Sequence, residues 1–284
     1  MNRANLLPRW LVGLLLSLCI VGVVSAAHAD EFTSEQAPAP AAAVPAAEAP
    51  TARAWSDGSA IPVPAGRVDF GLFQPLRWGV SEDVELAAQP LLEPIFPNVE
   101  ARVRWLHRGA FSIATWHRLT YPTRLLQTVS REGTLGLLPA NTNVPIALGL
   151  DTSFLVTVAS AADRTRGTFE VGVSLMPRLS AGDPVVLDFP FLYSRFAALS
   201  TSGTTYAGLA GTTLLSDKFT LAADARVTLI PVVSRGWMLE QGASITWTPS
   251  AHFGLSLGYR VAHGRYPVGV RTHLMPTLDV MFGF

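Results

Sequence analysis

Alternation of apolar and polar side chains is the feature that most constrains how this chain can fold. In residues 98–107 every second side chain is apolar, while Glu100, Arg102 and Arg104 occupy positions between them. Residues 219–230 repeat the pattern with a different set of side chains. A period of two places neighbouring side chains on opposite faces of a β-strand. Each such run therefore predicts a strand with one apolar face and one polar or charged face.

These runs are numerous and long. We predict about ten to twelve strands, at residues 66–78, 84–93, 98–107, 111–121, 146–158, 168–178, 185–196, 204–215, 219–230, 236–248, 252–263 and 271–284. Strands in soluble proteins average about five or six residues, and most of these runs are longer. A strand that crosses a bilayer needs about nine to eleven tilted residues. The sequence therefore predicts an all-β chain that forms an antiparallel transmembrane β-barrel.

Short polar segments separate several of the runs. Residues 81–83, 216–218 and 249–250 each lie between two alternating segments, where they predict tight hairpin turns. We expect these turns at the periplasmic end of the barrel. A turn at 81–83 requires an earlier crossing, which would have to come from around residues 60–64. The longer connection at 121–138 is expected to contain a short helix.

Composition agrees with a membrane-embedded chain. Hydrophobic residues make up 49% of the 284 residues and charged residues 15%, where an ordinary soluble domain has about a quarter charged. The mean hydropathy is +0.32 and the formal net charge is +0. Because the charges balance and Lys218 is the one lysine, the sequence offers no basic surface, and we expect no nucleic-acid partner.

The first 29 residues have the pattern of a secretory signal peptide. Arg3 and Arg9 precede an apolar run at 11–24, and residues 27–29 read Ala-His-Ala. A basic start, an apolar centre and small residues before the cleavage site are the three parts of such a signal. We therefore expect residues 1–29 to be removed. The alternative, an uncleaved transmembrane helix, would need about twenty apolar residues.

The one cysteine, Cys19, lies within this signal. Leu18 precedes it, at a position where a lipoprotein cleavage site has a small side chain. The mature chain would therefore contain no thiol and no disulfide.

An Ala/Pro-rich segment follows the signal. Residues 37–50 contain eight alanines and four prolines. Such frequent proline prevents a helix, and nothing in the segment alternates as a strand would. We predict a disordered Ala/Pro-rich tether at 30–54 and the barrel at 55–284.

The end of the chain carries the most specific pattern. Alternate positions of the last run are Leu274, Pro276, Leu278, Val280, Phe282 and Phe284. Here the sequence resembles bacterial outer-membrane β-barrel proteins, which end on an alternating apolar strand with a terminal aromatic residue. The resemblance implies a Gram-negative outer-membrane location, closure of the barrel between the last and first strands, and recognition of Phe282 and Phe284 by the barrel-assembly machinery. Pro276 departs from the pattern, because a proline cannot donate to the ladder and is expected to weaken the closing strand.

A second, shorter likeness lies nearer the start of the barrel. Residues 76–86 resemble stretches in uncharacterised outer-membrane barrel families. This likeness implies no activity.

No group of residues predicts a reaction. Residues 254–258 match the G-x-S-x-G pattern of serine hydrolases, whose serine lies on a strand-to-helix turn, but here the pattern falls within an alternating run. The histidines, among them His117 and His263, show no spacing that predicts a partner serine or a metal site. We assign no catalytic residue, no metal and no cofactor, and leave enzyme activity open.

The polar faces of the strands define a lumen. The predicted lumen-lining residues are the acids Asp69, Glu85, Glu100, Asp151, Glu170, Asp188, Asp224, Glu240 and Asp279 and the bases Arg102, Arg104, Arg118, Arg226 and Arg260. Nine acids against five arginines favour cations over anions. Charges of both signs can pair within a packed interior or line a water-filled passage.

The sequence therefore predicts an outer-membrane β-barrel whose specific role is open. It is either a structural barrel or a porin-like conduit for a small solute or an apolar ligand. The alternatives are a lipid-modifying enzyme and a barrel that acts in envelope interactions through its outer loops. The expected partners are outer-membrane lipid and the assembly machinery, and the sequence assigns no oligomeric state.

Overall fold

The computed structural model describes residues 55–131, 138–140, 142–183, 185–187, 190–231, 236–267 and 269–284. The predicted signal peptide at 1–29 and the predicted tether at 30–54 lie outside the described residues. The lumen candidate Asp188 lies outside them too.

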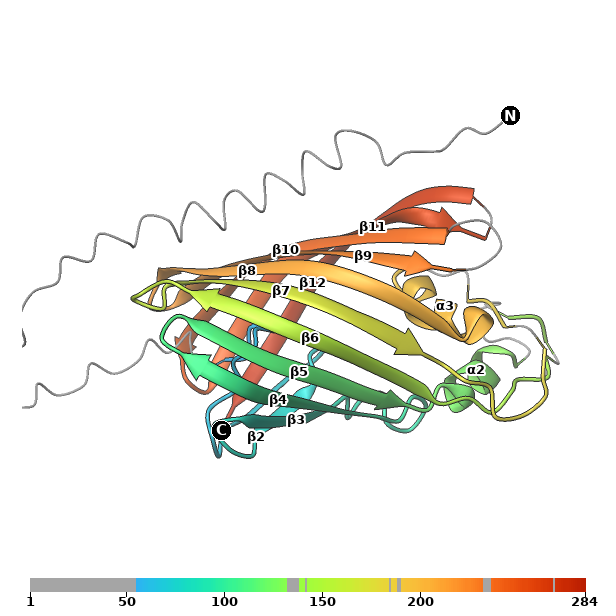
Figure 1. Ribbon diagram of the computed structural model, residues 1–284, viewed down its shortest axis with the longest axis horizontal. Coiled ribbons are helices and arrows are strands. Elements are labelled where there is room, and N and C mark those ends of the chain that lie inside the picture. The colour runs from blue at the N-terminus through green and yellow to red at the C-terminus, as the bar shows by residue number, and fades with distance from the viewer. Residues whose placement is uncertain are drawn as a thin grey trace, which may run out of the picture.

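The chain forms one closed antiparallel barrel (Figure 1). Its strands are β1 (Val68–Gly71), β2 (Leu76–Gly79), β3 (Val84–Ala88), β4 (Asn98–Arg108), β5 (Phe111–Thr120), β6 (Gly149–Ala159), β7 (Thr165–Leu175), β8 (Gly203–Ser216), β9 (Phe219–Ile230), β10 (Gly236–Ser250), β11 (Phe253–Tyr266) and β12 (Gly269–Gly283). Each strand pairs with the next along the chain, and β12 pairs with β1. The predicted antiparallel barrel is confirmed.

The predicted number of strands is confirmed, although two errors cancel. The run predicted as one strand at 66–78 contains two short strands, β1 and β2. The chain reverses between them at 72–75, where Pro75 has no N–H to donate to a ladder. The extra crossing expected near residues 60–64 is wrong, because these residues form no strand.

The strand predicted at 185–196 is also wrong. The described part of this region leads into helix α3 (Tyr193–Thr201). Pro190 has no N–H to donate, and Phe191 has a left-handed φ of 63°, so an extended ladder cannot continue through them. The other ten predicted runs each correspond to one strand.

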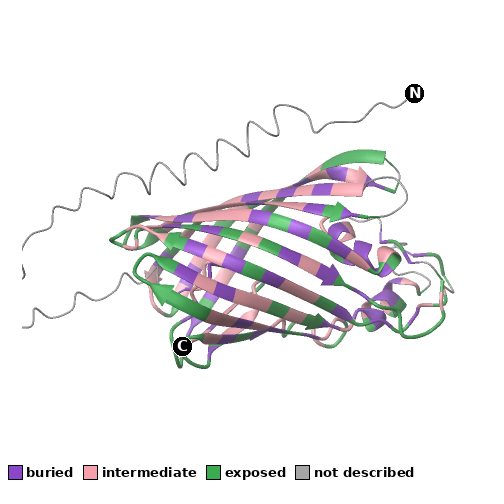
Figure 2. Cartoon of the chain, in the orientation of Figure 1, coloured by how far each residue is buried: buried purple, intermediate pink, exposed green. Residues whose placement is uncertain are grey.

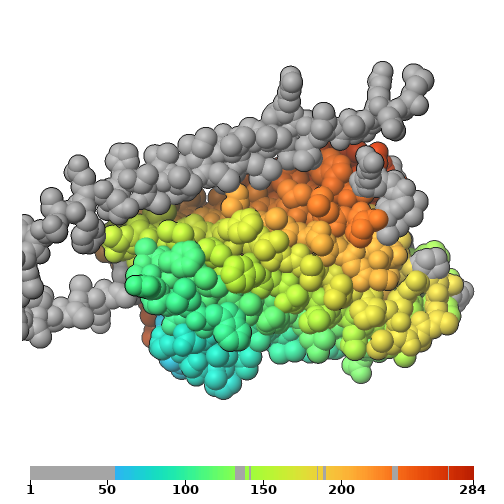
Figure 3. All heavy atoms as spheres, in the orientation of Figure 1, coloured from blue at the N-terminus to red at the C-terminus, as the bar shows by residue number. Residues whose placement is uncertain are grey.

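Large apolar side chains cover the outer wall of the barrel. Leu221, Leu257 and Leu278 are 42%, 58% and 55% exposed. Buried and exposed residues alternate along β4 to β8 in Figure 2, and the same strands form a continuous outer surface in Figure 3. Closure satisfies the backbone hydrogen bonds that hydrocarbon cannot. Within the described ranges no helix is long and apolar enough to cross a membrane.

The two ends of the barrel differ in their connections. At one end, which we name the turn end, the links at 80–83, 109–110, 160–164, 217–218 and 251–252 are short. The three predicted hairpin turns lie at this end, together with the C-terminus. At the other end, the loop end, the links at 121–148 and 176–202 are long and contain the helices.

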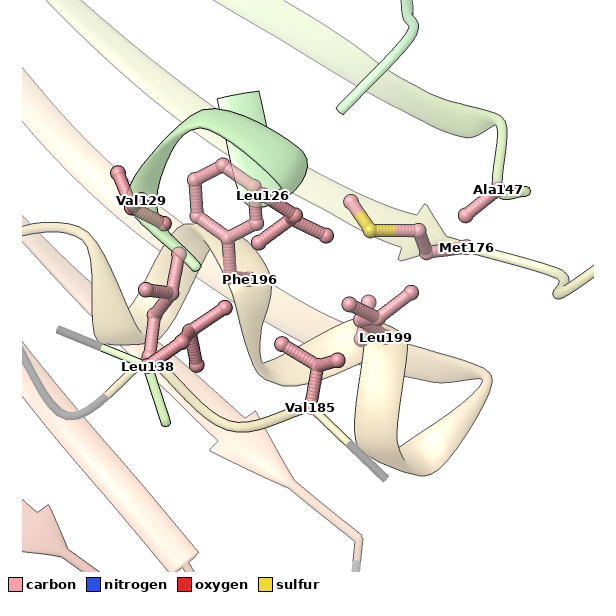
Figure 4. Close-up of a cluster of buried hydrophobic side chains, with 10 residues drawn as sticks. Leu126, Val129, Leu138, Ala147, Met176, Val185, Phe196 and Leu199 are labelled. Carbon is pink, nitrogen blue, oxygen red and sulfur yellow. The ribbon is translucent and has the colours of Figure 1, made fainter. Parts of the chain in front are cut away.

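An apolar layer lies at the loop end. Helix α2 (Thr123–Val129) confirms the short helix predicted within 121–138. Leu126 of α2 packs near Phe196 and Leu199 of α3 (Figure 4). The buried members of the cluster are Leu126, Val129, Leu138, Ala147, Met176, Val185, Leu187, Phe196, Ala198 and Leu199. The largest buried apolar cluster of the described residues therefore lies between the loops, while smaller clusters lie against β9 to β11 and against β5 and β6.

The last strand closes on the first, as the resemblance implied. Val68 and Phe284 exchange both of their backbone hydrogen bonds, at 3.0 and 2.8 Å. Phe70 lies opposite Phe282 in the ladder, and their rings stack with centroids 5.3 Å apart. The terminal aromatic residues thus belong to the seam of the barrel.

Pro276 breaks none of the hydrogen bonds that close the barrel, so the expected weakening is wrong. Even-numbered residues of β12 direct their backbone groups towards β1, and the last of these bonds runs from Leu72 N–H to the Val280 carbonyl at 3.0 Å. Odd-numbered residues bond towards β11, as Gly283 N–H does to the His252 carbonyl. Pro276 therefore turns its nitrogen towards an edge beyond the β1 ladder, where proline is tolerated.

Candidate functional site in the barrel lumen

A buried ion cluster lies on the wall formed by β2, β3 and β4. Glu85 is 1% exposed. Arg77 Nη1 lies 2.6 Å from its Oε1, and Arg102 Nη1 lies 3.3 Å from its Oε2. Arg102 was predicted as lumen-lining, whereas Arg77 was missed although a period of two would place it on the same face as the predicted Asp69. We name this part of the lumen the closed side.

The described chain before β1 lies inside the barrel, against this cluster. We name residues 55–64 the N-terminal segment. Val63 N–H donates to Glu85 Oε2 at 3.0 Å, and Ala60 N–H donates to Thr157 Oγ1 at 2.8 Å. Ala60 is fully buried and Val63 is 2% exposed. The absence of alternation gave no signal that this segment would enter the lumen.

Charged groups continue along β4, β5 and β6. Arg118 lies between two acids, with its Nε 3.0 Å from Asp151 Oδ2 and its Nη1 3.6 Å from Glu100 Oε1. Glu100 also accepts a hydrogen bond from Trp116 Nε1 at 3.2 Å. The structure thus brings together three predicted lumen residues in one chain of contacts.

A second pair lies on β7 and β9. Arg226 Nη2 is 2.6 Å from Glu170 Oε2, and its guanidinium lies 4.5 Å from the centroid of the Tyr206 ring. This guanidinium is therefore fixed by one charge-assisted hydrogen bond and one cation–π contact.

Helix α3 reaches the lumen from the loop end. Ser194 Oγ donates a hydrogen bond to Glu240 Oε1, and Arg195 Nη2 lies 3.5 Å from Glu240 Oε2. Arg195 and Ser194 were missed because their region was predicted as a strand. The helix therefore adds a base to the lumen that no wall strand supplies.

A small polar cavity lies beneath α3. It is lined by Arg118, Asp151, Ser174, Ser194, Arg195, Thr204, Tyr206, Arg226, Thr228 and Glu240. The volume of this cavity is about 20 Å³, which is enough for one or two water molecules. Three arginines against two acids give this lining a positive charge.

The lumen near β9 and β11 is accessible to solvent, and we name it the open side. Asp224 Oδ1 and Arg260 Nη2 are 3.4 Å apart, and their side chains are 37% and 42% exposed. Met275, the register partner of Arg260 on β12, is 41% exposed. These two predicted lumen residues therefore contact water to a far greater extent than Glu85 does.

Two predicted lumen residues lie away from these groups. Arg104 Nε pairs with Asp83 Oδ1 at 2.8 Å in the turn between β2 and β3. Asp279 is 8% exposed, and its Oδ1 accepts the Phe73 N–H at 3.0 Å, beyond the last bond of the β1–β12 ladder. Arg104 therefore belongs to the rim, and Asp279 to the seam.

The structure corrects the charge balance predicted for the lumen. Arg67, Arg77, Arg166 and Arg195 join the predicted bases, Asp57 joins the predicted acids, and Asp188 lies outside the described residues. The acids and arginines of the described lumen are then even in number. A general preference for cations no longer follows.

The motifs that suggested chemistry occupy ordinary structural positions. Ser256 of the G-x-S-x-G match lies within β11 and accepts a hydrogen bond from Thr246 at 3.0 Å. His117 Nδ1 contacts Thr152 Oγ1 at 2.7 Å between β5 and β6. Among the described residues, no three His, Cys, Asp or Glu side chains are grouped as a metal site.

Comparison with known proteins yields distant structural likenesses. No protein-family model and no curated protein matches this chain. One similar solved structure is the outer-membrane expressed OmpT of Vibrio cholerae, with 8% identity and a TM-score of 0.44 over 74% of this chain and 64% of that one. Another is OmpT folded in vitro, an outer membrane protein of Vibrio cholerae, with 7% identity and a TM-score of 0.42 over 74% and 63%. The chain thus matches less than two thirds of either protein.

The closed ladder and the apolar wall carry the assignment. In a bilayer only a closed sheet satisfies every strand, and a wall of exposed leucines requires hydrocarbon around it. The chain therefore has the architecture of a transmembrane β-barrel.

Proposed function

We propose that the protein is a conduit for small hydrophilic solutes across the outer membrane. The observation that carries the proposal is the exposure of the Asp224–Arg260 pair, whose side chains face inward and are 37% and 42% exposed. Both residues lie near the middle of their strands, β9 and β11. Water therefore reaches the lumen at mid-height, along the open side.

The chemistry of the interior supports this proposal. Burying a charged pair costs desolvation that apolar packing would avoid, so a barrel that only needed a filled interior gains little from such pairs. In a water-filled passage the same charges attract solutes of opposite sign and raise their local concentration.

The cavity beneath α3 indicates which solutes pass. With a volume of about 20 Å³, this section has space for one or two water molecules. Its arginines, Arg118, Arg195 and Arg226, outnumber its acids, Asp151 and Glu240. We therefore expect small anions to be preferred at this section.

Planar-bilayer recording tests the proposal. The folded protein should produce stepwise conductance. Arg260→Gln should move the ion selectivity towards cations, and Asp224→Asn should move it towards anions. Asp83→Asn is the control, because this carboxylate lies in a turn and is 62% exposed. Silence of the folded protein at every voltage would refute the conduit.

A structural barrel without conductance is the second candidate. The closed side favours it, since Glu85 and Arg102 are almost completely buried and the N-terminal segment packs against them. The two candidates differ in one measurement. A structural barrel remains silent in bilayers, while its loss weakens the envelope against detergents.

A further inference from the structure

The N-terminal segment is not part of the barrel wall. The ladder from β1 to β12 closes without it, and residues 55–64 add no strand. The segment nonetheless lies within the lumen, where Ser59, Ala60 and Val63 are buried. It is a separate element inside a complete barrel.

The segment extends across the lumen near the turn end. Trp55 lies against the Arg67 guanidinium beside β1, with 4.8 Å from Cζ to the ring centroid. Asp57 Oδ2 lies 3.0 Å from Arg166 Nη1 on β7 and 3.3 Å from Thr212 Oγ1 on β8. Contacts on opposite walls mean that the segment crosses the passage rather than following one strand.

The rest of the segment returns to the starting side. Ala60 N–H donates to Thr157 on β6, and Val63 N–H donates to Glu85 on β3. Apolar groups of the segment are buried as well: Ala60 belongs to a small cluster with Ala114 and Leu155, and Val63 is 2% exposed. Each hydrogen bond of the segment contributes only a modest net free energy, and the charged Asp57–Arg166 contact a larger one, so releasing the segment breaks a small number of modest interactions.

A tight turn joins the segment to β1. Arg67 N–H donates to the Pro64 carbonyl at 3.1 Å, and Gly66 has a φ of 80°, as the third residue of a type II turn requires. Gly79 leaves room for this passage, because a Cβ there would lie 2.1 Å from the Pro64 carbonyl oxygen. The turn is thus the covalent link between the segment and β1, and the segment's other described contacts with the wall are noncovalent.

We propose that the N-terminal segment is a dissociable plug that closes the turn end of the conduit. This inference rests on the proposed conduit function. The plug leaves through the turn end by pivoting about the 64–67 turn. Its departure exposes Arg166, Thr157 and Glu85 to water. The open side then becomes continuous with the turn-end mouth, and solutes pass.

A cross-link tests the plug in the whole chain. The pair Ala60→Cys and Thr157→Cys joins the segment to β6, where the two residues are in direct contact. The control pair, Thr157→Cys with Thr168→Cys, joins β6 to β7 at register partners whose hydroxyl groups are 2.8 Å apart. Both pairs share one substitution and differ only in whether the plug is tied.

Conductance is recorded before and after oxidation, with disulfide formation verified by mass. Oxidation should abolish conductance in the plug pair, restore it on reduction, and leave the control pair conducting. Asp57→Asn, which removes the charge that faces Arg166, should raise the open fraction about tenfold, or about 1.4 kcal/mol. Conductance that persists in the oxidised plug pair overturns the plug and leaves the conduit intact.

A second measurement separates the plug from the conduit. The Ala60→Cys chain is treated with a water-soluble maleimide in the folded state, with Thr157→Cys as the matched wall position. If the plug dissociates, the thiol introduced by Ala60→Cys becomes accessible and reacts with the maleimide. The reaction should be faster when Asp57→Asn is added, because this change favours dissociation. If this thiol stays unreactive in both backgrounds, the plug is overturned whatever the conductance. If it reacts and no form conducts, the conduit fails instead, and the plug with it.

Discussion

Replacing Glu85 with glutamine tests whether the closed side stabilises the barrel. The carboxylate faces two arginines, Arg77 at 2.6 Å and Arg102 at 3.3 Å, and also accepts the Val63 N–H at 3.0 Å. Glutamine keeps the size of the side chain and removes its charge. The two guanidinium groups then lie close together without the anion that compensates them.

The size of the effect follows from burial. Glu85 is 1% exposed and Arg102 is 4% exposed, so water cannot replace the lost carboxylate. Breaking a buried pair by removing one partner costs about 3 to 5 kcal/mol. Two arginines share this one acid, so we expect the upper part of that range. Asp83→Asn removes one acid from the exposed pair with Arg104, which should cost about 0.2 to 1 kcal/mol.

The assay is reversible unfolding by urea in lipid vesicles, followed by tryptophan fluorescence. Glu85→Gln should lower the free energy of unfolding several times more than Asp83→Asn does. The double change Glu85→Gln with Arg102→Met removes one stranded charge and should recover part of the loss. Equal effects of Glu85→Gln and Asp83→Asn would refute the view that the closed side is a desolvated ion cluster.

Two further predictions concern the wall and the seam. Leu257→Arg places a charge on a side chain that is 58% exposed on the outer wall, and should cost about 2 to 4 kcal/mol near the bilayer midplane. Ser256→Arg, at the preceding residue, faces the open side and should cost much less. Equal costs in the vesicle assay would mean that the faces of β11 are reversed. Phe284→Ala should reduce the amount of assembled, heat-modifiable protein in outer membranes, because the resemblance assigns this residue to recognition by the assembly machinery; unchanged assembly would contradict that assignment.

Sequence patterning predicted the wall but not what fills it. A period of two is a local property, so β8 to β12 could be located from residues 203–283 with small errors at their ends. The run at 66–78 was misread because a proline and a four-residue reversal interrupt it without breaking its apolar character. The run at 185–196 is largely apolar, but Pro190 within it argued against a strand, and Phe191 adopts a left-handed conformation.

The lumen was only partly predictable for a related reason. Alternation predicts which face of a strand a side chain occupies, and it identified Arg118, Asp151 and Glu100 as facing the lumen. In the structure Arg118 contacts both acids. It carries no information on elements that enter the barrel from outside the wall. Arg195 comes from a loop helix and pairs with Glu240, and Asp57 comes from the chain before β1 and pairs with Arg166. The alternation of side chains along a strand cannot predict either contact.

Inward charges have different effects on the two sides of this barrel because water reaches only one of them. On the closed side the N-terminal segment excludes water, so a charge there matters mainly for stability, and its loss leaves a partner without solvent. On the open side Asp224 and Arg260 stay hydrated, so losing either partner leaves the other in water at little cost. Glu85→Gln should therefore destabilise the barrel, whereas Arg260→Gln should change ion selectivity with little loss of stability. If the plug dissociates, Glu85 moves from a buried environment to one that water reaches. Because Asp57→Asn favours dissociation, Glu85→Gln should destabilise the barrel less in a chain that also carries Asp57→Asn.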